Sequence, residues 1–394
     1  MHPFNKSMDC IIPGHNVRTF ACAVGCLSRI GKEMYIEFDP LHGLIIRTLN
    51  DAKSAFASFS FEPNFFERCS SPIEVQTLNT SHHSRKKRKS QGGNTSTFTA
   101  HSNNDENDEK YMCRIPLRSV HSILRPRKGI VSLRIRSHRS TQKSYDSLSQ
   151  DNLNGFITYS DTQDSTSSQP SNDDRRNDNP NFKYQLSFEF VISTNGILRV
   201  TRRLNVADCT SMKAIATREN SSQILSSPKT LLKLISPLKK TSELALHFQH
   251  SKRILSAASF HPSDTNISSV TSNMHIDHSS NALLKTETSM KCDEFEEYHW
   301  LDNRDVHDES TSTNRSIPLN VNEEVILVFG IKEAKAMLQF CSQANLNEEH
   351  YITFSFEWGG KPIIFDTESD YFSGELIMAT LDHKLLVGYH VGEN

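Results

Sequence analysis

The sequence lacks any long apolar run. Its longest uninterrupted stretch, "VILVFGI" at 325–331, falls far short of the roughly 18 residues that cross a bilayer. The first ten residues, "MHPFNKSMDC", have no apolar core of the kind that a secretory signal needs. We therefore expect an intracellular protein with no membrane partner.

Paired cysteines are absent as well. The eight cysteines are scattered singly, with no CxxC pair. Cys22 and Cys26 lie one helical turn apart, but no paired His or Cys accompanies them, so we interpret them as core thiols. "GCLSRIGKE" is not a phosphate-binding loop, because five residues separate Gly25 from Gly31 and Glu33 stands where Ser or Thr is required. The sequence therefore predicts neither a metal site nor a cofactor.

Apolar residues are also sparse. They make up 36% of the 394 residues, which is little for a chain that is folded throughout. Four polar stretches account for the shortfall, and we interpret them as inserts that bury too little apolar surface to fold. These stretches are 78–110, 137–181, 261–281 and 300–320. The remainder suits two compact domains, which we predict at 8–204 and 223–390 with a linker at 205–222.

Outside the inserts, one pattern occurs four times: an amphipathic helix followed by short alternating strands. Asn16 is placed to cap the first helix and Gly31 to end it. Pro237 ends or kinks the third helix. The helices are predicted at 16–31, 116–126, 228–240 and 331–344.

The strands are clearest in the hairpin 44–49 and 54–61, which turns at Asn50 and Asp51. Units of this kind cover one face of an antiparallel sheet with helices, so the predicted class is α+β with two similar domains. Short strands are predicted before the helices at 8–12, 111–115 and 323–330. The other strands are predicted at 33–38, 129–137, 184–192, 197–204, 243–249, 253–259, 283–290, 351–358, 362–366 and 373–381.

Basic charge gathers on the predicted helices, although the whole chain has a net charge of −2. The windows 16–32, 116–128, 229–240 and 331–342 hold thirteen basic residues against the single acid Glu333. The apolar helix faces belong to the core, so the basic faces point outward, as a surface that binds a polyanion does. No aromatic stripe or base-reading motif accompanies the charge, so the expected contacts are with phosphates and are independent of sequence. The thirteen are Arg18, Arg29, Lys32, Arg118, Arg125, Arg127, Lys128, Lys229, Lys233, Lys239, Lys240, Lys332 and Lys335.

The hairpin segment "RTLNDAKSAFASFSFEPNFF" closely resembles the corresponding hairpin of the Rad-nine family. Members of this family form one subunit of the heterotrimeric nine-one-one DNA-damage checkpoint clamp. The segments "MDC", "LSRIGKEMYIE", "YQLSFEF", "LLKTETSM", "LQFCSQANLN" and "FSGELIMATL" resemble the family at matching places along the chain. The resemblance therefore extends over both predicted domains.

This resemblance implies the sliding-clamp fold, similar to that of the proliferating cell nuclear antigen, with basic helices inside and sheets outside. It implies a ring around double-stranded DNA, two sister subunits of the Rad-one and Hus-one types, and a dedicated clamp loader. The implied function is a non-enzymatic platform for checkpoint signalling and DNA repair in the nucleus. The thirteen basic residues become the candidates for facing DNA, whereas Arg47 and Lys53 on the hairpin are predicted to make surface or neighbour contacts.

Two motifs lie in the predicted inserts. "RKKRK" is typical of a nuclear localisation signal, with a solvated charge run as the alternative. Family members commonly carry a long phosphorylated tail, whereas this sequence ends soon after its last predicted strand. The inserts hold Ser-Gln and Thr-Gln pairs, which damage-response kinases prefer, although Ser-rich sequence also yields such pairs by chance. The signal is Arg85, Lys86, Lys87, Arg88 and Lys89, and the phosphorylation candidates are Ser90, Thr141, Ser149, Thr162 and Ser168.

Two other functions stay open. Asp293, Glu294, Glu296 and Glu297 form an acidic cluster with the ligand type that a Mg²⁺-dependent nuclease uses, although no His or Lys partner has a defined spacing. The second alternative is a homotrimeric processivity clamp. The mass of the isolated chain in solution distinguishes that alternative from a heterotrimeric one.

Overall fold

The computed structural model describes most of the chain, and its elements follow one order twice. Within the described residues, each half contains nine strands and two α-helices, with the α-helices after its first and sixth strands. This order matches the predicted pattern of repeated helix-plus-sheet units. The described residues are 7–70, 110–125, 127–139, 184–194, 196–238, 241–261, 285–301, 323–344 and 350–386.

The bounds of the elements are as follows. The first half comprises β1 (Asp9–Pro13), α1 (Gly14–Ile30), β2 (Glu33–Asp39), β3 (Gly43–Leu49), β4 (Ala55–Phe61), β5 (Arg68–Ser70), β6 (Tyr111–Pro116), α2 (Leu117–Ile123), β7 (Ile130–Arg139), β8 (Tyr184–Ser193) and β9 (Ile197–Val206). The second half comprises β10 (Ser222–Ser226), α3 (Pro228–Ile235), β11 (Glu243–Gln249), β12 (Ile254–Phe260), β13 (Glu287–Lys291), β14 (Glu297–His299), β15 (Glu324–Gly330), α4 (Ile331–Ala344), β16 (Ile352–Phe356), β17 (Ile363–Glu368) and β18 (Phe372–Met378).

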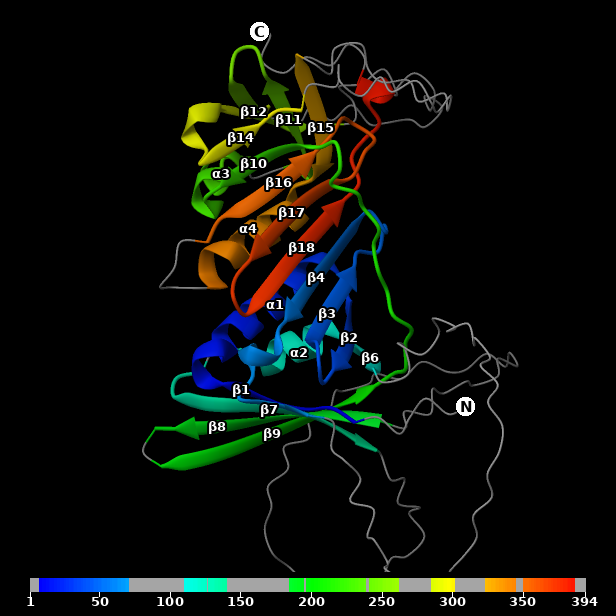
Figure 1. Cartoon of the computed structure of the whole chain (residues 1–394), viewed down its shortest axis with the longest axis vertical. Helices are drawn as coiled ribbons and strands as arrows, with labels where there is room; N and C mark the ends of the chain where they lie inside the picture. The colour runs from blue at the N-terminus through cyan, green and yellow to red at the C-terminus, as the bar shows by residue number, and fades with distance from the viewer. Residues whose placement is uncertain are drawn as a thin grey trace, which may run out of the picture.

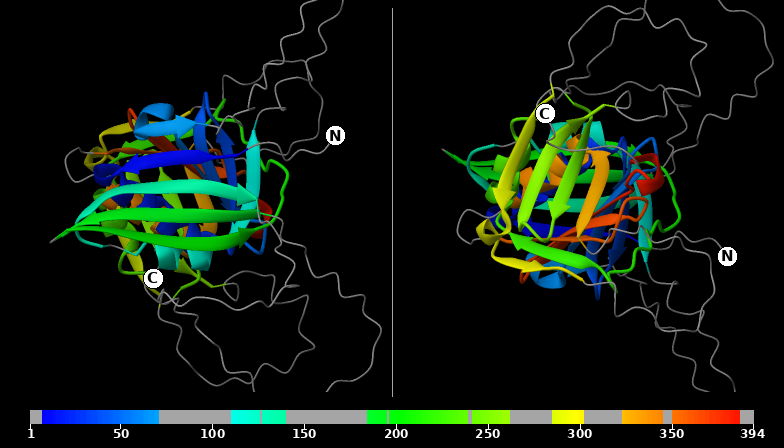
Figure 2. Two further views of the ribbon diagram at one scale, coloured as in Figure 1. Left: turned by 90° about the horizontal axis from the view of Figure 1, so that it is seen from below. Right: turned by 90° about the horizontal axis from the view of Figure 1, so that it is seen from above.

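The strands form three antiparallel sheets (Figure 1). The largest has nine strands in the order β14-β10-β16-β17-β18-β4-β3-β2-β6 and joins the two halves through β18 and β4. A five-stranded sheet, β5-β1-β7-β8-β9, closes one end of the molecule, and a four-stranded sheet, β13-β12-β11-β15, closes the other. Figure 2 shows these two end sheets face on.

The four helices lie behind the nine-stranded sheet in Figure 1, between the two end sheets. α1 packs against α2 and α4, and α3 packs against α4. The core is continuous across the halves, because the ring of Phe59 on β4 lies 4.5 Å from that of Phe340 on α4. Thr19 of α1 also donates a hydrogen bond to the carbonyl of Ala344 at 2.8 Å. The four helices therefore cover one face of the large sheet, as predicted.

The residues that begin and end α1 play other roles than those predicted. The helix begins at Gly14 with Pro13 at its N-cap, and Asn16 does not cap it. Asn16 instead donates to the backbone carbonyl of Phe65 at 2.8 Å. Gly31 does end the helix, but its backbone is extended, and a Cβ there would lie 2.6 Å from the carbonyl oxygen of Leu49. Glycine is required at this position for close packing on β3 rather than for a left-handed turn.

Two other helices are shorter than predicted, and three strands were not predicted. α2 ends at Ile123 and α3 at Ile235, each shortly before a proline in the sequence, because proline has no N–H to donate and its ring clashes with the preceding helical turn. Ser236, which follows α3, still has helical dihedral angles. α4 has the predicted bounds. The missed strands are β5, β10 and β14, whose three to five residues are too short to show an alternating pattern. The predicted insert 137–181 also begins inside β7, which runs to Arg139.

In the part of the chain that the structure describes, no helix has the length and apolarity needed to cross a membrane.

Candidate nucleic-acid interface

Eleven of the thirteen predicted basic residues belong to the described chain, and seven of them lie on helices. Lys239 and Lys240 lie outside the described residues. Arg18 and Arg29 are on α1, Arg118 is on α2, Lys229 and Lys233 are on α3, and Lys332 and Lys335 are on α4. The other four, Lys32, Arg125, Arg127 and Lys128, follow α1 or α2, because both helices end earlier than the predicted windows.

Most of the helix-borne cations are free of acidic partners. All except Lys335 are exposed, and none of these six forms an ion pair with a carboxylate of the described residues. Lys335 is half-buried, and its Nζ donates to the carbonyl of Leu238 at 2.9 Å, so it also holds the chain that follows α3. Lys32 forms an ion pair with Asp51 at 2.6 Å, and this hydrogen bond raises the pKa of Lys32. The helix side therefore presents basic groups that remain available for an anion.

Four arginines surround one cavity of about 680 Å³ on this side, between α1, α2 and α4. They are Arg18, Arg29, Arg125 and Arg127. Arg29 donates a hydrogen bond to the side chain of Gln339 on α4, and the guanidinium of Arg127 lies 5.1 Å from the centre of the Phe190 ring. We call this space the helix-side cavity.

Cys22 and Cys26 lie on α1 beside the helix-side cavity. Burial raises the pKa of the Cys22 thiol, and the neighbouring charge of Arg18 opposes that rise. Burial likewise raises the pKa of the Cys26 thiol. Both therefore stay protonated at neutral pH, which agrees with their interpretation as core thiols.

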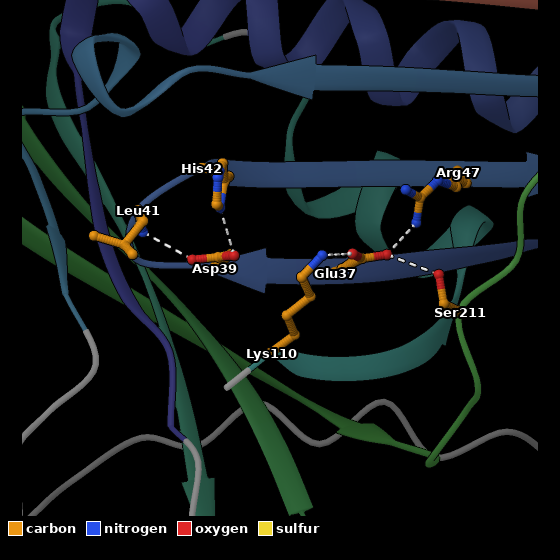
Figure 3. A network of polar contacts seen from close by, with 7 residues as sticks. All are labelled: Glu37, Asp39, Leu41, His42, Arg47, Lys110 and Ser211. Atoms are coloured by element: carbon orange, nitrogen blue, oxygen red, sulfur yellow. Dashed lines mark hydrogen bonds and ion pairs between the residues drawn. The ribbon is translucent and has the colours of Figure 1, made fainter. Parts of the chain in front are cut away.

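A network of polar side chains centres on Glu37 of β2, on the face of the large sheet away from the helices (Figure 3). Glu37 is buried and bonds to Arg47 at 2.6 Å, Lys110 at 3.1 Å and Ser211 at 3.0 Å. Burial opposes ionisation of Glu37, but the hydrogen bonds from these three partners outweigh it and lower the pKa of the carboxyl group. Beside them, Asp39 accepts a hydrogen bond from the backbone N–H of Leu41 and is paired with His42.

This Glu37 network corrects two predictions. Arg47 is not a surface or neighbour contact, because it is 7% exposed and paired within its own chain. Lys110 does not belong to a loose insert, because it reaches the sheet. Ser211 comes from the linker, so the network ties the linker to β2.

A further polar group ties the linker to the second half of the chain. Arg218 donates to Asp366 on β17 at 2.8 Å and to Glu375 on β18 at 2.5 Å. The hydrogen bonds to Asp366 raise the pKa of Arg218 further above its already high value. The predicted linker 205–222 is thus held near both ends, and its terminal residues are parts of β9 and β10. Sequence reasoning missed these partners, since 148 positions separate Arg218 from Asp366.

The acidic cluster of the nuclease alternative has protein partners. Asp293 pairs with Arg253 at 2.9 Å, and Glu296 accepts a hydrogen bond from the backbone N–H of Ser227. Nowhere in the described ranges do three His, Cys, Asp or Glu side chains gather as a metal site would require. The "RKKRK" motif at 85–89 and the five phosphorylation candidates lie outside the described residues.

Comparison with known proteins gives a family match over most of the chain. The Rad9 family model matches residues 20–381. The cell cycle checkpoint control protein Rad9 of Drosophila melanogaster is 43% identical over 60 residues, which are 15% of this chain. That match spans 13% of the relative's own length.

Solved structures give the fold. The proliferating cell nuclear antigen (PCNA) of Thermococcus kodakaraensis is similar with a TM-score of 0.52 at 8% identity, covering 95% of this chain and 99% of its own. The PCNA2–PCNA3 complex of Sulfolobus tokodaii gives 0.51 at 7% identity, covering 94% and 98%. The PCNA of Entamoeba histolytica gives 0.50 at 10% identity, covering 95% and 98%.

Proposed function

The chain belongs to the Rad9 family, and from that premise we propose that it is a subunit of a checkpoint clamp that encircles double-stranded DNA in the nucleus. It acts as a platform for DNA-damage signalling and repair, without enzymatic activity of its own. Its two halves are the two domains, 8–204 and 223–390, joined by the linker. Its unpaired helix cations face the DNA and contact phosphates without reading sequence.

One observation supports a ring: within the chain, the two halves are joined by the same kind of strand pairing that would join neighbouring subunits. β18 pairs with β4 along seven residues, from Phe372 opposite Phe61 to Met378 opposite Ala55. The counterpart of β18 in the first half is β9, and the counterpart of β4 in the second half is β13. Among the described strands, both counterparts lie at an edge of their sheet. Pairing of β9 with β13 of the next subunit repeats the internal contact head to tail, and such repetition closes a ring when the rotation between subunits adds up to a full turn.

The two free edges also favour different neighbours over copies of this chain. β9 has ten residues and β13 has five. In a ring of identical subunits, part of β9 would lack a partner, and unpaired strand edges tend to bind other chains. Ile197 and Leu198 at the start of β9 are 78% and 56% exposed, so they are available to a longer strand. This mismatch supports sister subunits that differ from this chain. Their Rad-one and Hus-one types, and the clamp loader that places the ring on DNA, are proposed from the family alone.

Assembly in solution tests the proposal. The full chain alone should have the mass of a monomer, and co-expression with both sister subunits should yield a complex with one copy of each. A trimer formed by this chain alone would favour the homotrimeric clamp instead. A chain that stays monomeric in the presence of both sisters would contradict the proposal.

A further inference from the structure

The helix-side cavity is a larger hollow than the proposed contact with duplex DNA requires. Its volume of about 680 Å³ is within the range of roughly 300–1,000 Å³ that small-molecule sites occupy. A base-paired duplex keeps its bases stacked inside, so it presents phosphates to a surface but nothing that fills a cavity. The cavity therefore calls for an occupant of its own.

The charge around the cavity specifies an anion. Arg18, Arg29, Arg125 and Arg127 line it together with His121, and no Asp or Glu does. None of the four arginines is paired with a carboxylate within the described ranges. Guanidinium groups bind phosphate through two parallel hydrogen bonds, so this set favours a phosphate group.

The remaining walls specify what the phosphate is attached to. Ala21 and Cys22 of α1 and Ile130 at the start of β7 provide half-buried apolar surface, and Gln343 of α4 provides an exposed amide. Amides of this kind bond to the edges of bases, and apolar side chains cover their flat faces. An acidic peptide would use the arginines but would leave the apolar wall uncovered.

A small residue keeps the cavity open. A Cβ at Gly25 would lie 3.7 Å from Nε2 of His121, which is an ordinary contact. Packing therefore does not require glycine at this position in the middle of α1, where glycine costs helix stability. A larger side chain there would extend into the cavity.

We propose that the helix-side cavity binds one unpaired nucleotide of a single DNA strand. Its phosphate lies among the arginines, and its base lies against Ile130 and the amide of Gln343. This inference rests on the proposed function, which supplies the DNA. It adds that the helix-side cavity binds one nucleotide of an unpaired strand.

Fluorescence anisotropy of the full chain with a short labelled oligothymidylate tests the proposal. The double variant Arg18→Ala/Arg125→Ala should bind at least about tenfold more weakly, since each charged hydrogen bond lost costs roughly that factor. The control Arg118→Ala/Lys229→Ala removes the same charge from helix positions outside the cavity. It should weaken blunt duplex as much as the cavity variant does, but oligothymidylate much less. Equal losses for both variants on oligothymidylate would overturn the inference.

A second pair of variants leaves the charge unchanged. Gly25→Leu should fill the cavity and lower oligothymidylate binding severalfold, whereas Gly25→Ala should leave it unaltered. Circular dichroism checks that both variants fold, and if Gly25→Leu does not, the arginine pairs decide. Displacement of oligothymidylate by polyglutamate as readily as by a deoxynucleoside monophosphate would also overturn the inference.

Assembly with the sister subunits separates the two proposals. The cavity variants should still assemble, because they lie away from β9 and β13. Failure of assembly with intact oligothymidylate binding would refute the clamp and leave the nucleotide site standing. Normal assembly without cavity-dependent binding would refute the site alone.

Discussion

Replacing Glu37 by alanine should destabilise the protein strongly, because it leaves Arg47 buried without its partner. The side chains of Arg47 and Glu37 are 8% and 6% exposed, and 2.6 Å separates their charged atoms. Breaking a buried pair by removing one member costs about 3–5 kcal/mol. Lys110 and Ser211 are more exposed and can return to water, so we expect about 3 kcal/mol.

The control is the same substitution four residues earlier on β2. Glu33 is paired with Arg114 at 3.1 Å, but both side chains are 44% exposed. Surface pairs contribute about 0–1 kcal/mol, so Glu33→Ala should be close to neutral. Urea unfolding followed by far-ultraviolet circular dichroism measures both variants. Equal losses for the two variants would refute the reasoning, because burial would then not decide the cost.

The same network predicts a dependence on pH. Folding lowers the pKa of Glu37 from its ordinary value of 4.5, so the ionised carboxylate stabilises the folded state. That contribution is fully present above pH 4.5 and is lost as the pH falls through the lowered pKa. The difference in unfolding free energy between the natural protein and Glu37→Gln should therefore shrink below pH 4.5. A difference that stays constant across that range would contradict the assigned cause.

Four further predictions address the proposed function. Alanine at the two lysines of α3 and the two of α4 should reduce the magnitude of the slope of log affinity for duplex DNA against log salt by about 3. The expected number is three and not four because Lys335 already donates to the carbonyl of Leu238. An unchanged slope would remove these residues from the interface. Ser289→Pro removes an outward N–H of the edge strand β13 and should abolish one subunit contact in native mass spectrometry, whereas Ser289→Ala should not. Deletion of 85–89 should lower the nuclear fraction of the protein, and unchanged import would dismiss this motif as a localisation signal. Peptide mapping after DNA damage should find phosphate on the Ser-Gln and Thr-Gln candidates, and five unphosphorylated sites would dismiss them.

Local pattern was enough to predict most of the elements. The apolar spacing of α4 gave both of its ends, and alternation gave the hairpin of β3 and β4. That the helices cover one face of the sheet also followed from sequence, because each helix has one apolar face. Sequence reasoning erred where an end depends on a partner far along the chain, as at Asn16, which bonds to Phe65 instead of capping α1.

What the sequence by itself determined is the repeated helix-plus-sheet plan and the segregation of basic residues near the helices. Only the tertiary structure decided which charged side chains are exposed and which are paired within the chain. Arg47, Lys110 and Ser211 converge on one buried carboxylate, and 174 positions separate Ser211 from Glu37. Arg18 and Arg125, from two different elements, come to line one cavity. Periodicity is a property of neighbours along the chain, whereas burial and charge pairing depend on segments that meet only when the sheets and helices pack.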